Sequence, residues 1–205
     1  MQRFLAVIFS VFLISACTIP ETKIYSIYMT TPPLPPFSNG EIRMGVNEID
    51  STAEKSLIVM IDAPRYLSQA YIAYRNSPYQ LEISRYSKWE SPPNNMVREA
   101  FKTRIFSTGD FKEVRSSNIV PNGFYSLAIN LKKFERYDEG NDSFGDLFFD
   151  VQLSSPDGKE LYHQTISKHV KLDDETFLSL AKGLSAALSE SIEEVSESIT
   201  GRFKK

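Results

Sequence analysis

The sequence has 205 residues, a formal net charge of −3, 41% hydrophobic residues and a single cysteine. This balance argues against nucleic acid as a partner, because phosphate binding needs a basic patch. One cysteine excludes a disulfide within the chain, so burial must stabilise the fold, and a chain of this length can build one core.

The first sixteen residues are typical of a targeting segment. Met1-Gln2-Arg3 carries one positive charge, and residues 4–16 are apolar except for two serines. This run is shorter than the ~20 residues that a permanent transmembrane helix needs. It ends in Leu13-Ile14-Ser15-Ala16-Cys17, which resembles the lipobox of bacterial lipoproteins. We therefore expect a signal peptide over 1–16 and a lipid on Cys17. The alternative is a plain secretory signal, but a lone uncapped thiol would be a liability in an oxidising compartment.

Residues 17–40 are expected to form the lipidated N-terminus and a Pro-rich tether. Ile24–Tyr28 has the pattern of a short strand, and prolines fill four of the five positions of 32–36. Such a run favours an extended polyproline spacer, with a loop wrapped over the domain as the alternative. If Tyr25 and Tyr28 dock on the sheet, the tether is short. Residues 41–205 are expected to form a single α/β domain in the periplasm.

Strand patterns dominate from residue 56 to residue 86. Leu57–Ile61 is an unbroken apolar run, typical of a strand covered on both faces. Two further runs, 71–75 and 80–86, flank a turn at 76–78. Ser91 then precedes Pro92 in the order of an N-cap and a first turn. Apolar residues recur at helical spacing from there, so we predict a helix over residues 92–107.

The second half of the sequence predicts a meander and a long helix. Residues 125–131 alternate apolar and polar, and Phe134 then falls out of phase, which indicates a bulge near Lys132-Lys133. Alternating strands follow at 147–153 and, after a Pro-Asp-Gly turn, at about 160–170. Asp173 is placed to cap a helix over 174–200 with one apolar stripe. These elements predict an α/β fold, a mixed and largely antiparallel sheet with two packed helices.

Residues that could carry catalysis or bind a metal are sparse. His163 and His169 share a face of one predicted strand but lie roughly 20 Å apart, too far to ligate one metal. Ser185 lies in the middle of a predicted helix and not at the strand-to-helix turn of a nucleophile elbow, so we interpret it as solvated. The acidic loop 138–142 lacks the spacing of a calcium loop and is interpreted as a solvated hairpin. We expect no enzyme activity, no metal and no cofactor besides the covalent lipid on Cys17.

The order of several motifs resembles a known family. Ile61-Asp62-Ala63-Pro64-Arg65-Tyr66-Leu67 is followed by Ile72-Ala73-Tyr74-Arg75, by Tyr79-Gln80-Leu81, by Trp89-Glu90-Ser91-Pro92 at a helix start, and later by Phe134-Glu135-Arg136-Tyr137-Asp138. Together with the lipobox and the long final helix, this order resembles the ABC-type transport auxiliary lipoproteins of the PqiC type. The sequence departs from the family at Pro93, where an aliphatic residue is usual, and in a longer insert around residues 38–53.

The resemblance implies a non-enzymatic outer-membrane subunit of a lipid transport system. Such lipoproteins work with periplasmic proteins that contain mammalian-cell-entry (MCE) domains and with inner-membrane permeases, moving phospholipid or related lipids and maintaining envelope integrity. Thr18 is not the aspartate that commonly retains lipoproteins at the inner membrane, which favours anchoring on the periplasmic face of the outer membrane. The sequence leaves open whether the protein forms a homo-oligomer. Two other functions also remain as alternatives: an adaptor lipoprotein for outer-membrane assembly or cell-wall synthesis, and a periplasmic lipid carrier or hydrolase.

Six residues are candidates for contact with the transport partner: Arg65, Tyr66, Leu67, Tyr71, Tyr74 and Trp89. The segment 64–67 leaves the end of an apolar strand, and such loops often carry binding residues. Arg and Tyr are also enriched where interfaces concentrate their binding energy. The alternatives are that Tyr66 and Leu67 fold back onto the core while Arg65 is solvated, and that Trp89 packs beneath the first helix.

Overall fold

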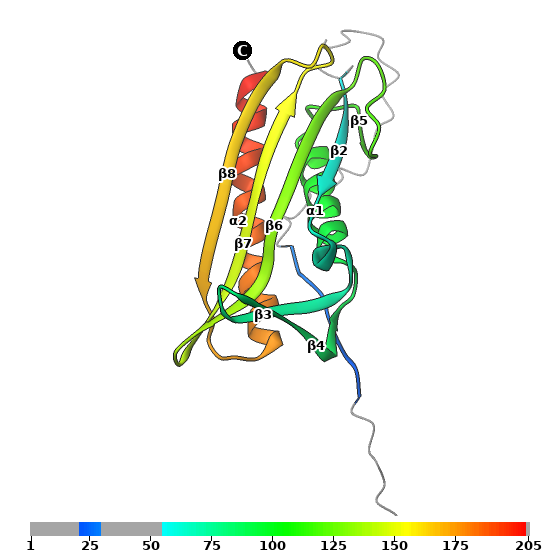
Figure 1. Ribbon diagram of the computed structural model, residues 1–205. Helices are drawn as coiled ribbons and strands as arrows, with labels where there is room; N and C mark the ends of the chain where they lie inside the picture. The colour runs from blue at the N-terminus through cyan, green and yellow to red at the C-terminus, as the bar shows by residue number, and fades with distance from the viewer. Residues whose placement is uncertain (1–20, 30–54, 204–205) are drawn as a thin grey trace, which may run out of the picture.

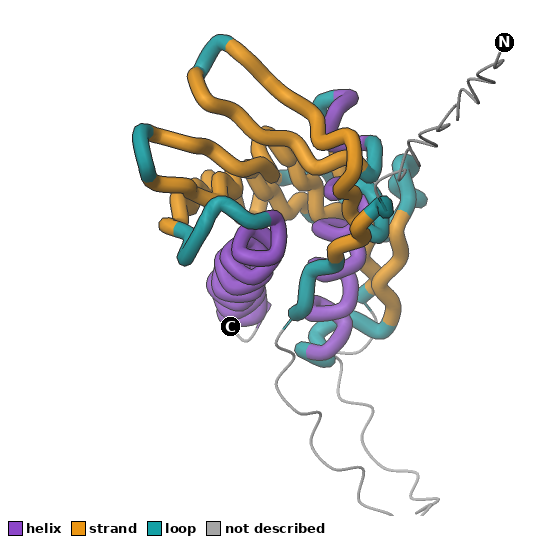
Figure 2. The backbone as a smooth tube through the Cα atoms, turned by 90° about the horizontal axis from the view of Figure 1, so that it is seen from below, coloured by secondary structure: helices purple, strands orange, loops and turns teal. Residues whose placement is uncertain are grey.

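The computed structural model describes residues 21–29 and 55–203, which form an eight-stranded sheet and two helices (Figure 1). Cys17, the Pro-rich run 32–36 and residues 41–54 lie outside the described residues. The helices are α1 (Pro93–Ser107) and α2 (Phe177–Phe203), and a 3-10 turn η1 spans Arg65–Ser68. Figure 2 shows both helices on the same side of the sheet, so the fold has two layers. The strands are β1 (Lys23–Tyr25), β2 (Ser56–Asp62), β3 (Tyr71–Ser77), β4 (Gln80–Trp89), β5 (Glu113–Ser116), β6 (Tyr125–Glu139), β7 (Asp142–Ser154) and β8 (Glu160–Lys171).

Strand β6 organises the sheet because both of its edges are paired. Along one edge β7 runs antiparallel over the whole of β7, and β8 continues antiparallel beyond it. Along the other edge β2 pairs in parallel with residues 125–130 and β3 pairs in parallel with residues 136 and 137. β5 extends the sheet beyond β2, while β4 and then β1 extend it beyond β3. The α/β fold is confirmed: the sheet is mixed, and its longest pairings are antiparallel.

A bulge in β6 lies where the sequence predicts it. The register between β6 and β7 shifts between Leu131 and Lys133. The extra residue returns Phe134 to the face that carries Leu131, and both side chains are fully buried. Without that shift, the alternation of a strand would turn Phe134 away from the helices.

The hydrophobic core lies between the sheet and the two helices. Helix α2 packs its predicted apolar stripe against β7 and β8, and α1 packs against β2 and β5. Aromatic edges join the layers: the rings of Phe101 on α1 and Phe149 on β7 have centroids 5.6 Å apart. Neither helix reaches the length and hydropathy of a membrane-spanning helix within the described residues.

Both helices are found where the sequence predicts them, but their first residues differ. Pro92 precedes α1 and Pro93 is its first residue, so Ser91 does not cap it. A proline fits here because the first helical N–H has no partner inside the helix. Before α2, the Oγ1 of Thr176 accepts the N–H of the third helical residue at 3.2 Å. The expected cap at Asp173 is therefore wrong, and Thr176 takes that role.

The interpretation of Ser185 as a solvated residue is also wrong. Ser185 is 8% exposed, on the side of α2 that faces the protein. Its hydroxyl donates to the carbonyl oxygen of Ala181 at 2.6 Å. A serine can be buried in a helix because its own side chain satisfies this carbonyl one turn earlier.

Candidate functional site

The loop between β2 and β3, which contains η1, crosses the point where the parallel pairing along β6 is interrupted. Over residues 131–135 neither β2 nor β3 pairs with β6. The hydroxyl of Tyr66 fills this gap, lying 3.1 Å from the carbonyl oxygen of Lys132 and 3.0 Å from Oε2 of Glu135. Tyr66 therefore holds the loop against the sheet.

Glu135 is a fully buried carboxylate held by two partners. Its Oε1 accepts the Nε–H of Arg75 at 2.7 Å, and its Oε2 accepts from Tyr66. Burial of the ring, and then the charge of Glu135, raise the pKa of Tyr66 well above its ordinary value, so this hydroxyl stays protonated. A charge in this position is tolerated because both carboxylate oxygens are hydrogen-bonded. We interpret the cluster of Tyr66, Arg75 and Glu135 as structural support for the loop.

Two of the six candidate contact residues are buried. Leu67 is 1% exposed and Trp89 is 2% exposed, and Trp89 meets Phe134 edge to face with ring centroids 5.3 Å apart. Their side chains are therefore not presented to a partner in this structure, which agrees with the packing alternative for both. Tyr66 is half-buried, and its hydroxyl is already hydrogen-bonded to Glu135 within the protein.

Of the remaining three candidates, Tyr71 and Tyr74 lie on β3 and Arg65 lies on η1. Tyr74 points to the helix side, where its hydroxyl donates to Glu82 at 2.8 Å and its ring lies under the guanidinium of Arg136. Arg65 and Tyr71 are exposed. The structure thus leaves Arg65 and Tyr71 free to contact another molecule, and it does not gather all six candidates into one surface.

The N-terminal segment 21–29 is fastened across the helix side of the molecule. β1 pairs in parallel with the end of β4, and the carbonyl oxygen of Tyr25 accepts the N–H of Glu90 at 2.7 Å. Further along, the N–H of Tyr28 donates to Oγ of Ser185 at 3.0 Å. Tyr25 also packs on Phe177 at the start of α2, with ring centroids 6.3 Å apart. This part of the predicted tether is therefore docked on the domain.

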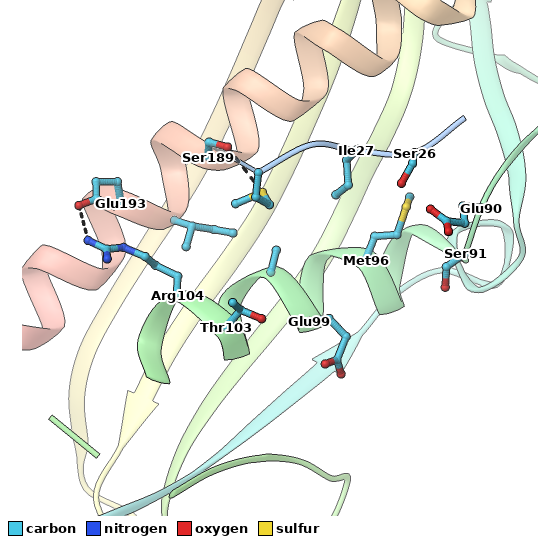
Figure 3. Close-up of a pocket in the computed structure, with 13 residues that line it drawn as sticks. Ser26, Ile27, Glu90, Ser91, Met96, Glu99, Thr103, Arg104, Ser189 and Glu193 are labelled. Carbon is cyan, nitrogen blue, oxygen red and sulfur yellow. Dashed lines mark hydrogen bonds and ion pairs between the residues drawn. The ribbon is translucent and has the colours of Figure 1, made fainter. Parts of the chain in front are cut away.

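A groove of about 370 Å³ lies between α1, α2 and the N-terminal segment (Figure 3). Ile27 and Met29 contribute its N-terminal wall, Met96 rises from α1, and Ile192 belongs to α2. At one end Arg104 on α1 forms an ion pair with Glu193 on α2. Most of its exposed lining is apolar, so it can accept an apolar segment or chain.

Sequence reasoning did not find this groove or the buried carboxylate. The walls of the groove come from three segments that are distant in sequence, and each apolar residue in them satisfies the pattern of an ordinary core position. A charged pair such as Glu135 and Arg75 also has no local signature. The one available signal for the groove was the mostly apolar sequence at 24–29, shortly before the prolines.

The two histidines behave as separate surface residues. His169 on β8 lies with its Nδ1 2.5 Å from Oδ1 of Asp146 and stacks on the ring of Phe144. His163 lies six residues earlier on the same strand. Within the part of the chain that the structure describes, no group of three or more His, Cys, Asp or Glu side chains is arranged to hold a metal.

Comparison with known proteins identifies a family model and several solved structures. The model is described as the ABC-type transport auxiliary lipoprotein component, and it matches residues 47–196. No curated protein matches the chain.

Solved structures share the architecture at low sequence identity. A protein from Xanthomonas campestris is 18% identical with a TM-score of 0.65, over 84% of this chain and 92% of its own. The crystal structure of an uncharacterized protein is also 18% identical, with a TM-score of 0.61 over 87% of this chain and 99% of its own. The PelC dodecamer from Paraburkholderia phytofirmans is 14% identical with a TM-score of 0.42, over 70% of this chain and 86% of its own. The first two likenesses show the fold alone.

Proposed function

The chain belongs to the family of ABC-type transport auxiliary lipoprotein components, and from this we propose that it is a lipid-anchored, non-catalytic subunit of an intermembrane lipid transport system. The proposed partners are a periplasmic MCE-domain protein and an inner-membrane permease, and the proposed cargo is phospholipid. The proposed location is the periplasmic face of the outer membrane, with the lipid on Cys17. The observation that carries the proposal is the family match over residues 47–196.

The docked N-terminal segment supports a role as an anchored subunit. Lys23 already belongs to β1, so only residues 18–22 separate the proposed lipid from the fold. Six residue steps span at most roughly 20 Å. A subunit with so short a connection to its lipid stays beside its membrane, where it can bind one end of a partner that crosses the periplasm.

Arg65 is the residue through which we propose contact with the MCE-domain protein. It is exposed, and it stands on a loop that Tyr66 and Leu67 fix in place. An interface residue on a rigid support loses little conformational entropy on binding.

A periplasmic lipid carrier is the second candidate function, and the groove between the helices is the observation that favours it. The groove is apolar enough to take part of an acyl chain. At about 370 Å³ it lies at the small end of ligand pockets, and a carrier must enclose most of its lipid. The geometry therefore supports the anchored subunit better than the carrier.

The test is purification of the full-length lipoprotein from its native envelope after mild crosslinking, followed by identification of the crosslinked proteins. We expect an MCE-domain protein together with its permease. Recovery of outer-membrane assembly or cell-wall synthesis proteins in their place would assign the chain to another envelope machine. Recovery of the protein with stoichiometric phospholipid and no protein partner would favour the carrier.

A further inference from the structure

We propose that the face of β1, β3 and β4 that is turned away from the helices lies on the lipid bilayer that holds the anchor. This inference rests on the proposed lipidation of Cys17 and adds an orientation to it. The surface, named here the β1–β3–β4 patch, consists of Ile24, Tyr71, Ile83, Arg85, Tyr86 and Lys88.

The strand register places the patch on one face. Ile24 of β1 is paired with Lys88 of β4, and Lys88 with Tyr71 of β3, so the three form a row across the strands. The ammonium of Lys88 lies over the ring of Tyr71, 5.6 Å from its centroid. Ile83 is paired with Ala73, which lies two residues beyond Tyr71 on β3 and therefore on the same face. The register between β3 and β4 shifts between these two pairs, and this irregularity lets Ile83 and Lys88 share a face although an odd number of residues separates them.

The opposite face of the same strands is already occupied. Tyr25 and Tyr74 both pack on Phe177 at the start of α2, and Ile72 is fully buried. Because side chains alternate along a strand, their neighbours Ile24 and Tyr71 must point outwards. The apolar side chains of the patch are therefore exposed by the fold and are not disordered parts of the core.

The exposed apolar side chains of the described residues are concentrated here. Ten large ones are exposed, and five of them lie on β1, β3, β4 or the turn between β3 and β4. Ile24 is 70% exposed, and Tyr79 in the turn is 95% exposed. Exposed apolar side chains gathered on neighbouring strands mark an interaction site, and tyrosine is favoured at the interface between lipid and water.

Charge and chain length select a bilayer as the occupant. Two basic residues of β4, Arg85 and Lys88, lie among the apolar residues, and neither is ion-paired with another described residue. Basic residues among apolar ones bind anionic headgroups. The short connection from Cys17 to Lys23 keeps β1 within roughly 20 Å of the membrane surface. Figure 1 shows β1 and the β3–β4 hairpin at the end of the molecule opposite the C-terminus of α2.

The experiment uses site-specific fluorescence in the lipidated protein. Cys17 is the only cysteine of the sequence, and in the lipidated protein the proposed lipid blocks its thiol, so an introduced cysteine is labelled alone. Ile83→Cys is labelled with nitrobenzoxadiazole and reconstituted in vesicles of phosphatidylethanolamine and phosphatidylglycerol that contain nitroxide-labelled lipid. We expect loss of roughly half or more of its emission, because the probe lies at headgroup depth. The matched control is Ile119→Cys, in the loop between β5 and β6 and 77% exposed, whose emission should be nearly unchanged.

Each outcome decides the proposal. Equal quenching at both positions, or none at Ile83, overturns the orientation. A probe at Ile83 that responds only after addition of purified MCE-domain protein assigns the patch to protein docking and also overturns it. Flotation of the vesicles, measured in parallel, reports on the anchor separately: protein that floats with an unquenched Ile83 probe contradicts the patch and leaves the lipoprotein assignment intact. In vesicles of phosphatidylcholine alone, quenching at Ile83 should be weaker, since the anionic headgroups are absent.

Discussion

Replacing Trp89 by alanine is the most direct test of the packing described for the β4–α1 junction. The indole is buried in the core and meets Phe134 edge to face, so Trp89→Ala leaves a cavity there. Removal of a buried aromatic side chain costs about 3–5 kcal/mol. For a domain of this size that corresponds to a decrease of roughly 6–20 °C in Tm.

The conservative variant Trp89→Phe keeps an aromatic ring at this position and removes the indole N–H. The indole Nε1 has no hydrogen-bond acceptor among the described residues. Its loss therefore leaves no partner unsatisfied, and Trp89→Phe should cost about 1.5 kcal/mol or less. Thermal and urea unfolding followed by circular dichroism measure both variants, because Trp89→Ala removes the only tryptophan.

The wild-type protein provides an independent measurement of the same site. Its single tryptophan should emit at short wavelength and resist quenching by acrylamide, since the ring is 2% exposed. A cost below about 1 kcal/mol for Trp89→Ala would refute the packing argument. Strong acrylamide quenching of the wild type would refute it as well, and would restore Trp89 as a candidate contact residue.

Four other changes test separate parts of the molecule. Cys17→Ser should abolish incorporation of labelled fatty acid and release the protein from the membrane fraction; continued incorporation would contradict the lipobox assignment. Arg65→Glu should leave Tm unchanged and abolish crosslinking to the MCE-domain protein, and full retention of that crosslink would exclude this loop as the docking surface. Tyr66→Phe should lower the unfolding free energy by about 1–2 kcal/mol, because Glu135 loses a donor; the exposed Tyr79→Phe, its matched control, should have no effect. Ser185→Ala should speed proteolytic cleavage of the segment around Tyr28, whose N–H loses its acceptor, and an unchanged cleavage rate would show that this bond does not hold the segment.

The interior of the domain shows how far local patterns reach. The alternation at 125–131 and 147–153, the out-of-phase Phe134 and the stripe of α2 each state which side of an element is apolar, and each was found as predicted. These features are local, because the period of a strand or helix is set by its own backbone. The sequence by itself therefore determined the long strands of the meander, the two helices, the bulge and the α/β class.

The neighbours of each element were decided only by the tertiary structure. β5 has four residues and no clear alternation, and it exists because β2 offers it a parallel edge. Ser185 is buried because the N-terminal segment crosses α2 there, and Glu135 is buried because the loop at η1 closes over a gap in the sheet pairing. These polar side chains can be buried because they form hydrogen bonds with residues distant in sequence. A local sequence pattern does not indicate such partners.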